Sequence, residues 1–212
     1  MLRYIYGADL GAFPTLRDTM FQDRADQFKR RLDWDVEIDA SGAEKDAYDD
    51  LNPLYVIWEK ADGRHGGSMR FLPTTGQTML NDHFQHLTDD VRIESPLIWE
   101  STRFCLSDDA GPQVSAALML GGAEVGKNFY LNHAVGVFDA RMVRVYRRIG
   151  WAPTILGTEG QGRDAISVGL WDFSEPVKPQ LLERSGVTDD QSRQWFDLSF
   201  GAPKAAFEAE IA

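Results

Sequence analysis

Charged and aromatic residues recur in this chain at positions where a soluble domain normally carries interchangeable surface residues. A positioned carboxylate can act as a general base, and a guanidinium can hold carboxylates through paired hydrogen bonds. Aromatic faces attract cationic groups. Taken singly, each aromatic is equally well explained as core, and each charge as part of a surface ion pair. The residues concerned are Arg24, Phe28, Trp34, Asp46, Asp49, Arg70, Phe84, Glu100 and Arg103.

Apolar spacing predicts the elements that carry the first of these side chains. Intervals of three and four residues predict a helix over about 12–31, on which Arg24 and Phe28 share one face. The runs LYVIWE and SMRFLP, joined by the turn DGRHGG, are typical of two neighbouring strands, and Arg70 lies on the second.

The run PLIWESTRFCL predicts a further strand that carries both Glu100 and Arg103. An offset of three residues places two side chains on opposite faces of an unbroken strand. Either a bulge brings Glu100 and Arg103 to the same face, or Arg103 acts from the other side of the sheet. We favour the second arrangement from the sequence.

Helices alternate with strands along the rest of the chain, which indicates a three-layer α/β/α domain. No linker, repeat or low-complexity stretch interrupts residues 1–212, so a single domain is expected. The further predicted elements are a helix over 113–128, strands in FYLNHAVGVF, WAPTILG and AISVGLWDF, a helix over 139–150 and a short helix over 189–196.

Composition limits the classes of function. The formal net charge of -11 argues against nucleic acid or an anionic membrane as a partner. No apolar run approaches the roughly 20 residues that span a bilayer, and the start MLRYIYGADL does not resemble a signal peptide, so a cytoplasmic protein is expected. The single Cys105 excludes an internal disulfide.

Four arginines nevertheless form a local basic cluster on this acidic chain. The predicted helix over 139–150 begins at Asp139, a plausible N-cap, and ends at Gly150. Its cluster is either a solvated helix face or a docking surface for an acidic partner. The four residues are Arg141, Arg144, Arg147 and Arg148.

The sequence gives little support for a metal site or for nucleophilic catalysis. Asp46 and Asp49 could bind a hard cation, but no further acidic or histidine cluster follows them, and no metal site is predicted. There is no GxSxG motif, and neither Cys105 nor His133 has a sequence partner that indicates nucleophilic catalysis.

Four strings, in their order and spacing, resemble the acyl-homoserine lactone synthases, the autoinducer synthases of bacterial quorum sensing. They are RADQFKRRLDW, EKDAYD, GSMRFLPTTGQTML and WESTRF. The resemblance extends to about Trp171. It implies the fold of the N-acetyltransferases, a mixed sheet split by a V-shaped cleft. The implied reaction transfers an acyl chain from acyl carrier protein to the amine of S-adenosylmethionine and closes a lactone, releasing methylthioadenosine.

The resemblance also implies roles for the residues. Glu100 would be the general base, assisted by Arg103. The basic cluster Arg141, Arg144, Arg147 and Arg148 would dock the acidic carrier. S-adenosylmethionine would be a substrate, with no cofactor needed. Its side of the site would be formed by Arg24, Phe28, Trp34, Asp46, Asp49, Arg70 and Phe84.

Donor and chain specificity stay open at this point. Some relatives accept acyl-coenzyme A in place of the carrier. Relatives that prefer 3-oxo chains often carry a threonine where this chain has VGVFDAR, so the resemblance disfavours a 3-oxo preference. Two other classes are alternatives: an acyl-coenzyme A-dependent N-acyltransferase that acts on a different amine, and a non-catalytic module that binds S-adenosylmethionine.

Overall fold

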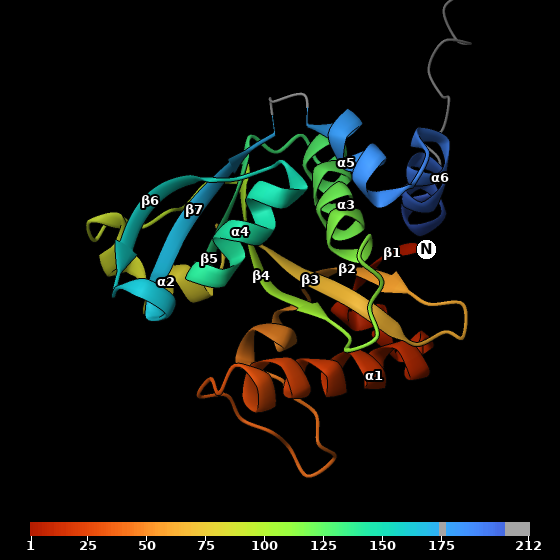
Figure 1. The fold of residues 1–212 in the computed structure, drawn as a ribbon, viewed down its shortest axis with the longest axis horizontal. Helices are drawn as coiled ribbons and strands as arrows, with labels where there is room; N and C mark the ends of the chain where they lie inside the picture. Colours follow the sequence, from red (N-terminus) through yellow and green to blue (C-terminus); the bar gives the residue numbers. More distant parts are fainter. Residues whose placement is uncertain (174–176, 202–212) are drawn as a thin grey trace, which may run out of the picture.

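A seven-stranded mixed sheet forms the centre of the computed structural model, which describes residues 1–173 and 177–201 (Figure 1). The strand order is β1-β2-β3-β4-β5-β7-β6. The pairing of β4 with β5 is parallel, and the other neighbouring strands pair antiparallel. The strands are β1 (Leu2–Tyr6), β2 (Leu54–Glu59), β3 (His65–Pro73), β4 (Ile98–Leu106), β5 (His133–Asp139), β6 (Thr154–Glu159) and β7 (Ile166–Asp172).

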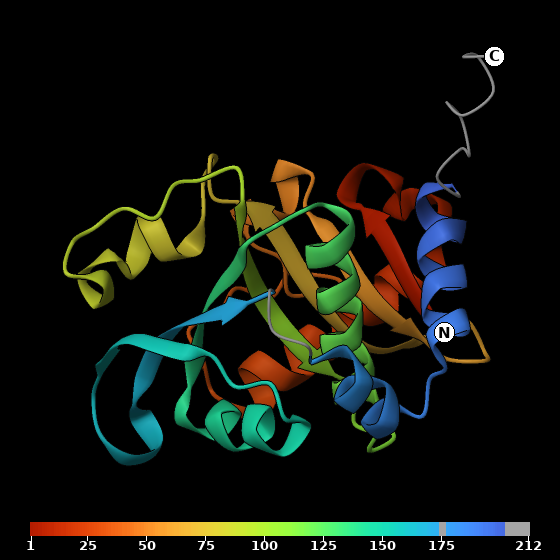
Figure 2. The same cartoon turned by 90° about the horizontal axis from the view of Figure 1, so that it is seen from above.

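Helices cover both faces of this sheet and make the three layers predicted from the sequence. One face is covered by α1 (Pro14–Ala25) over the β1 to β4 half and by α2 (Met79–His83) over the β5 to β7 half. The opposite face is covered by α3 (Val114–Asn128) and α4 (Ala140–Ile149). Figure 2 shows α5 (Lys178–Ser185) and α6 (Asp189–Phe200) outside α3, with α6 beside β1.

Alternation of side chains along β2 explains why both faces are buried. Leu54 and Val56 join the larger apolar cluster under α3, whereas Tyr55 and Ile57 join the cluster under α1. Successive strand residues point to opposite faces, so a central strand with apolar residues at every position requires a cover on each side. The sheet is therefore closed to water on both faces at β2.

The predicted elements are present, with differences at their ends. The strand expected in FYLNHAVGVF begins only at His133, and the strand expected in WAPTILG begins at Thr154 and continues to Glu159. The helix expected over 12–31 is α1 followed by η2 (Asp26–Arg31), a π-helical turn. The last helix begins at the expected Asp189 and continues to Phe200. The single domain expected over 1–212 stays a prediction, since residues 174–176 and 202–212 lie outside the described ranges.

A cleft opens between β4 and β5. Three residue pairs join these strands, the last of which is Glu100 opposite Val135. Beyond that pair, β4 bulges against β3, where Arg70 pairs with Thr102 but Ser68 pairs with Cys105. A bulge bends its strand and ends regular pairing. Glu100 therefore lies at the apex of the cleft. Across the described ranges, the helices are all too short or too polar to cross a membrane.

Candidate active site

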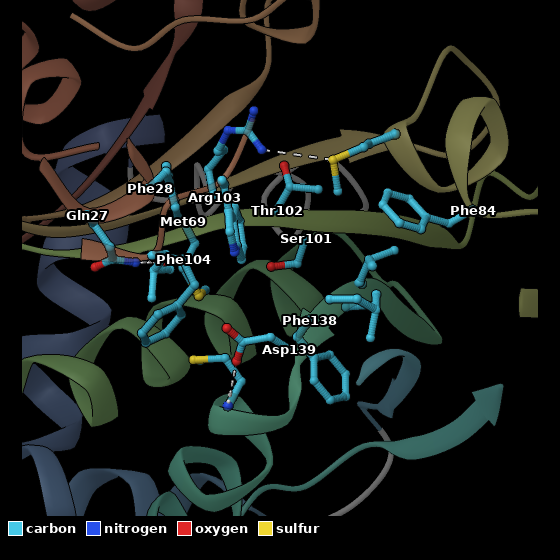
Figure 3. Close-up of a pocket in the computed structure, with 18 of the residues that line it drawn as sticks. Gln27, Phe28, Met69, Phe84, Ser101, Thr102, Arg103, Phe104, Phe138 and Asp139 are labelled. Atoms are coloured by element: carbon cyan, nitrogen blue, oxygen red, sulfur yellow. Dashed lines mark hydrogen bonds between the residues drawn. The ribbon is translucent and has the colours of Figure 1, made fainter. Parts of the chain in front are cut away.

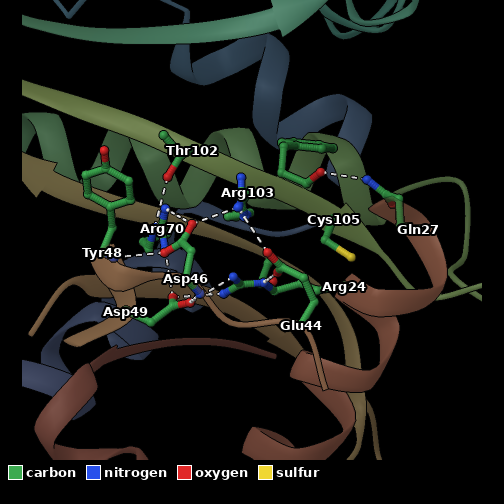
Figure 4. A network of polar contacts seen from close by, with 12 residues as sticks. Arg24, Gln27, Glu44, Asp46, Tyr48, Asp49, Arg70, Thr102, Arg103 and Cys105 are labelled. Atoms are coloured by element: carbon green, nitrogen blue, oxygen red, sulfur yellow. Dashed lines mark hydrogen bonds and ion pairs between the residues drawn. The ribbon is translucent and has the colours of Figure 1, made fainter. Parts of the chain in front are cut away.

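A buried network of three arginines and three carboxylates lies between α1 and the sheet (Figure 4). Arg24, at the end of α1, is 1% exposed. Its Nε donates to Glu44 at 2.6 Å, and its two terminal nitrogens donate to both oxygens of Asp49 at 2.9 Å. Bidentate pairing of this kind fixes orientation as well as charge. The network therefore anchors the end of α1 to the loop that contains Glu44 and Asp49.

Arg70 of β3 extends the network toward the cleft. It donates to Asp49 at 2.8 Å, to both oxygens of Asp46, and through Nε to Thr102 of β4 at 3.0 Å. Tyr55 also donates to Asp49, at 2.5 Å. These donors hold the pKa of Asp49 well below its ordinary value against the opposing effect of burial. The carboxylate therefore stays ionised in the fold.

The structure corrects the arrangement that we favoured for Arg103. This residue lies in the bulge of β4 with a φ of 53°, and its side chain reaches the face on which Arg70 lies. There it pairs with Glu44 at 3.0 Å and Asp46 at 2.7 Å. A positive φ is unfavourable for a non-glycine residue, and such positions persist where surrounding contacts hold them. The bulge, not the opposite face, therefore explains the odd spacing from Glu100.

Two stacked aromatic rings form the wall next to this network. Phe28 and Trp34 stack with ring centroids 5.1 Å apart, and the guanidinium of Arg103 lies 5.3 Å from the Phe28 centroid. Phe28 sits in the π-helical turn, which Gln27 fastens to the bulge through hydrogen bonds to the backbone of Phe104 and Leu106. The half-buried Trp34 is therefore the ring with a face free to meet a ligand.

Glu100 is held by the first turn of α2. Its two oxygens accept from the backbone N–H groups of Met79 and Leu80, at 3.0 and 2.6 Å. Burial raises the pKa of Glu100 to about 7, an effect that the two N–H donors oppose. The carboxyl group is therefore poised to gain or lose a proton near neutral pH. It is not part of the lining of the cavity described next, but it is hydrogen-bonded to the backbone of Met79, which is part of that lining.

A cavity of about 670 Å³ fills the cleft (Figure 3). Its charged wall includes Asp46 and Arg103, and the Nε of Arg103 is buried without a hydrogen-bond partner among the described residues. Phe84 lines the cavity on the opposite side of Arg103 from Phe28. Much of the remaining lining is apolar and comes from β3, β4, β5, β7, α3 and α4. The cavity thus joins a charged compartment to an apolar one.

The basic cluster lies beside this cavity on α4. All four arginines are exposed, as a docking surface requires. Arg141 also lines the cavity, 3.6 Å from Asp139. Asp139 is the helix N-cap, as predicted, and accepts from the backbone N–H groups of Arg141 and Met142. Whether Arg144, Arg147 and Arg148 meet a partner stays a prediction.

The network brings together five of the predicted residues, Arg24, Asp46, Asp49, Arg70 and Arg103, and the sequence analysis missed several members that complete it. Glu44 is 1% exposed, and Tyr48 lies under the guanidinium of Arg70. Gln27 and Glu44 fall inside strings already singled out, which was the available signal.

Asp46 and Asp49 are fully engaged by arginines, and the described residues contain no group of three or more acidic, histidine or cysteine side chains able to hold a metal ion.

Comparisons with known proteins identify the family of this chain. The family model of the autoinducer synthases matches residues 13–178. An acyl-homoserine-lactone synthase of Rhizobium etli is 41% identical over 164 residues, which cover 74% of this chain and 77% of that one. A second, from Agrobacterium fabrum, is 35% identical over 148 residues, covering 65% and 69%.

Solved structures share the fold. The CoA-dependent acyl-homoserine lactone synthase MesI superposes with a TM-score of 0.77 at 20% identity, covering 89% of this chain and 96% of that one. BjaI, solved with SAM and isopentyl-CoA, gives 0.77 at 22% identity, covering 89% and 90%. A putative N-acetyltransferase from Lactobacillus plantarum gives 0.54 at 14%, covering 81% and 98%. The match to the family model and to the Rhizobium etli enzyme shows that the chain belongs to the autoinducer synthase family and is an acyltransferase, an acyl-homoserine-lactone synthase.

Proposed function

We propose that the charged wall of the cavity holds S-adenosylmethionine while the apolar compartment holds the acyl chain of a thioester donor. The observation that carries this assignment is the position of Glu100. Its carboxyl group, with a pKa raised to about 7, belongs to the last residue pair before the cleft and accepts from the backbone of Met79, which lines the cavity. A general base works best when its pKa is close to the working pH. The junction of the compartments is therefore the proposed place of reaction.

The chemistry proceeds in two steps. The α-amine of S-adenosylmethionine loses a proton toward Glu100, through one water past Met79, and attacks the thioester carbonyl. The carbon–sulfur bond breaks, and the thiol leaves with a proton. The methionine carboxylate then attacks its own γ-carbon, and the bond to the sulfonium breaks to release methylthioadenosine. Positioning suffices for this second step, because the sulfonium is already a good leaving group and the electrophile is tethered. The reaction as proposed needs no metal or cofactor.

The charged wall supplies contacts for each part of S-adenosylmethionine. The guanidinium of Arg103, which lines the cavity, is a cationic donor suited to the substrate carboxylate. Trp34, with Phe28 stacked behind it, offers an aromatic face to the sulfonium or the adenine ring. Arg24, Asp49 and Arg70 are buried away from the cavity and would act by holding Asp46 and Arg103 in place.

We propose an acyl carrier protein as the donor, with acyl-coenzyme A as the alternative. The four arginines of α4 are exposed, and one of them, Arg141, lines the cavity. On a chain of net charge -11, this local basic surface suits an acidic protein partner. The solved relatives MesI and BjaI are CoA-dependent synthases, and for this reason acyl-coenzyme A is the alternative donor.

The reaction is tested by incubating the purified protein with S-adenosylmethionine and matched acyl-carrier and acyl-coenzyme A donors. Mass spectrometry of organic extracts would detect the acyl-homoserine lactone, and chromatography would detect methylthioadenosine. We expect both products in equal amounts. Acylation of a different amine, without methylthioadenosine, would instead indicate an N-acyltransferase. Binding of S-adenosylmethionine without any product would indicate a non-catalytic module.

Charge reversal on α4 should separate the donor from the other substrate. In Arg144→Glu/Arg147→Glu we expect the KM for the acyl carrier to rise about tenfold, because each reversed charge opposes association with an acidic partner. Affinity for S-adenosylmethionine, measured by calorimetry, should not change. The matched control, Arg64→Glu/Arg92→Glu, reverses two exposed arginines on other elements and should behave as wild type. An equal loss in both pairs, or in neither, would contradict docking at α4.

Loss of the exposed aromatic face should weaken binding of S-adenosylmethionine. For Trp34→Ala we expect about a tenfold higher Kd, equivalent to roughly 1.4 kcal/mol, in the range of a partly desolvated cation–π contact. Trp34→Phe keeps an aromatic face over Phe28 and should recover most of the affinity. Isothermal titration with S-adenosylmethionine measures both variants. Equal affinities of the alanine and phenylalanine variants would exclude a role for the ring.

A further inference from the structure

The apolar compartment of the cavity is enclosed by aromatic and methionine side chains, most of which are buried. Their rings pack edge to face: Phe138 and Trp171 have centroids 5.7 Å apart, and Trp151 and Phe173 are 5.6 Å apart. The indole N–H of Trp171 is satisfied by the backbone oxygen of Trp151, at 3.2 Å. The lining of this compartment includes Met69, Phe71, Met119, Phe138, Trp171 and Phe173.

Tyr146 interrupts this apolar surface with a hydroxyl group. It lies on α4, is 6% exposed and lines the cavity. Its ring is fixed by edge-to-face contacts with Phe138 and Trp171, whose centroids are 5.2 and 4.9 Å away. No hydrogen bond joins the Tyr146 hydroxyl to a described residue, and Asp139 is the charged group that acts on it electrostatically. Burial raises the pKa of this hydroxyl, so at neutral pH it can both donate and accept.

Packing alone does not explain this hydroxyl. Phenylalanine would make the same ring contacts, and a buried hydroxyl without a partner lowers stability. Tyr4 offers an instructive contrast, because its hydroxyl is also unpartnered but is fully enclosed and lies outside the cavity lining. The Tyr146 hydroxyl is not enclosed in this way, and Tyr146 lines the cavity. A molecule bound in the cavity can therefore reach the hydroxyl of Tyr146 but not that of Tyr4.

We propose that the Tyr146 hydroxyl binds an oxygen substituent of the acyl chain, and that the preferred donors are therefore 3-hydroxyacyl or 3-oxoacyl thioesters. Chains built by condensation of thioesters carry their oxygen at C3, first as a ketone and, after reduction, as a hydroxyl. This assignment rests on the proposed function, because it takes the apolar compartment as the place of the acyl chain. It departs from the expectation, drawn from the segment VGVFDAR, that a 3-oxo preference is disfavoured, because Tyr146 is a polar residue on α4 outside that segment.

This hydrogen bond should discriminate strongly between donors with and without an oxygen at C3. A pocket that hydrogen-bonds a substrate oxygen disfavours an analogue without it, because the buried polar group is then left unpaired. For donors of one chain length, we expect kcat/KM of the wild type to be about tenfold higher for the 3-hydroxy or 3-oxo form than for the unsubstituted form. In Tyr146→Phe this ratio should fall to about one. Tyr4→Phe removes the enclosed hydroxyl and should keep the wild-type ratio.

The experiment measures lactone formation with three donors, unsubstituted, 3-hydroxy and 3-oxo, for the wild type and both variants. Thermal unfolding with each lactone product provides a readout independent of catalysis: the oxygenated products should stabilise the wild type more than the unsubstituted one, and this difference should vanish in Tyr146→Phe. A wild type that uses all three donors equally, or a Tyr146→Phe variant that keeps the preference, would overturn the assignment. If the wild type makes no lactone from any donor, the proposed function fails instead.

Discussion

Glutamine in place of Glu100 is expected to slow amide formation by about 10²- to 10⁴-fold, the usual contribution of a positioned general base. The side chain keeps its size and can still accept one hydrogen bond from the first turn of α2, where the carboxylate accepts two, from Met79 and Leu80. It cannot take a proton from the substrate amine. Single-turnover measurement of the acylated product separates this step from lactone closure.

The pH dependence distinguishes a base from a group that only holds α2. With a pKa of about 7, Glu100 becomes ionised as the pH rises, so the wild-type rate should increase through pH 7. The substrate α-amine has its own ionisation near pH 8, by analogy with other α-amino groups. In the pH–rate profile, Glu100→Gln should lose the rise near pH 7 and keep the rise near pH 8. The measurement is the single-turnover rate between pH 5.5 and 9.

A matched variant tests the alternative that Glu100 merely positions α2. Thr78 caps this helix by accepting from the N–H of Asn81 and does not contact Glu100 in the structure. Thr78→Ala should lower the free energy of unfolding by about 1 kcal/mol while keeping the limb near pH 7. If Glu100→Gln also kept that limb, Glu100 would be a positioning residue and the base would lie elsewhere.

The elements of this fold could be predicted because their periodicity is strong. Apolar residues at the first five positions of LYVIWE and alternating ones in AISVGLWDF indicated strands, and the intervals in 12–31 indicated a helix. Neither pattern reports a bulge, because one inserted residue leaves local hydrophobicity almost unchanged. The bulge at Arg103 depends on the pairing of β3 with β4 and on the carboxylates that hold the arginine.

The polar part of the site was predicted less completely for a related reason. Glutamate and glutamine are residue types typical of the surface. Glu44 is buried and Gln27 is half-buried because they bind an arginine and backbone groups far away in the chain. The support of Glu100 by α2 also required three-dimensional contact, because its donors are backbone N–H groups that any residue could supply. Family resemblance identified the charged residues, but the structure was needed to show how they connect.

The largest loss of stability is expected for Asp49→Asn. Asp49 accepts from Arg24, Arg70, Tyr55 and the backbone of Asp46, and its side chain is 5% exposed. The substitution leaves the buried charges of Arg24 and Arg70 only partly compensated, by Glu44 and Asp46, and loss of a buried partner typically lowers the free energy of unfolding by about 3–5 kcal/mol. Urea unfolding at pH 7 measures the change. The neighbouring Asp50 is exposed, and Asp50→Asn should change stability by less than about 0.5 kcal/mol.

The two buried carboxyl groups should affect stability in different pH ranges and with opposite signs. Asp49 has a lowered pKa in the fold, so its contribution is present above its ordinary value of 3.8 and is lost as the pH falls below it. Glu100 has a raised pKa, and the native state therefore binds the extra proton between pH 4.5 and about 7. Stability should fall by about 3 kcal/mol as the pH rises through that interval.

Unfolding measured from pH 3 to pH 8 should therefore show its highest stability near pH 4 to 5. Asp49→Asn should remove the acid limb, whereas Glu100→Gln should remove the decline toward neutral pH. A Glu100→Gln variant whose stability still declined between pH 5 and 7 would show that another group causes the decline, and this would contradict a Glu100 carboxyl group that titrates near neutral pH. The same carboxyl group thus links a thermodynamic measurement without substrate to the proposed catalytic step.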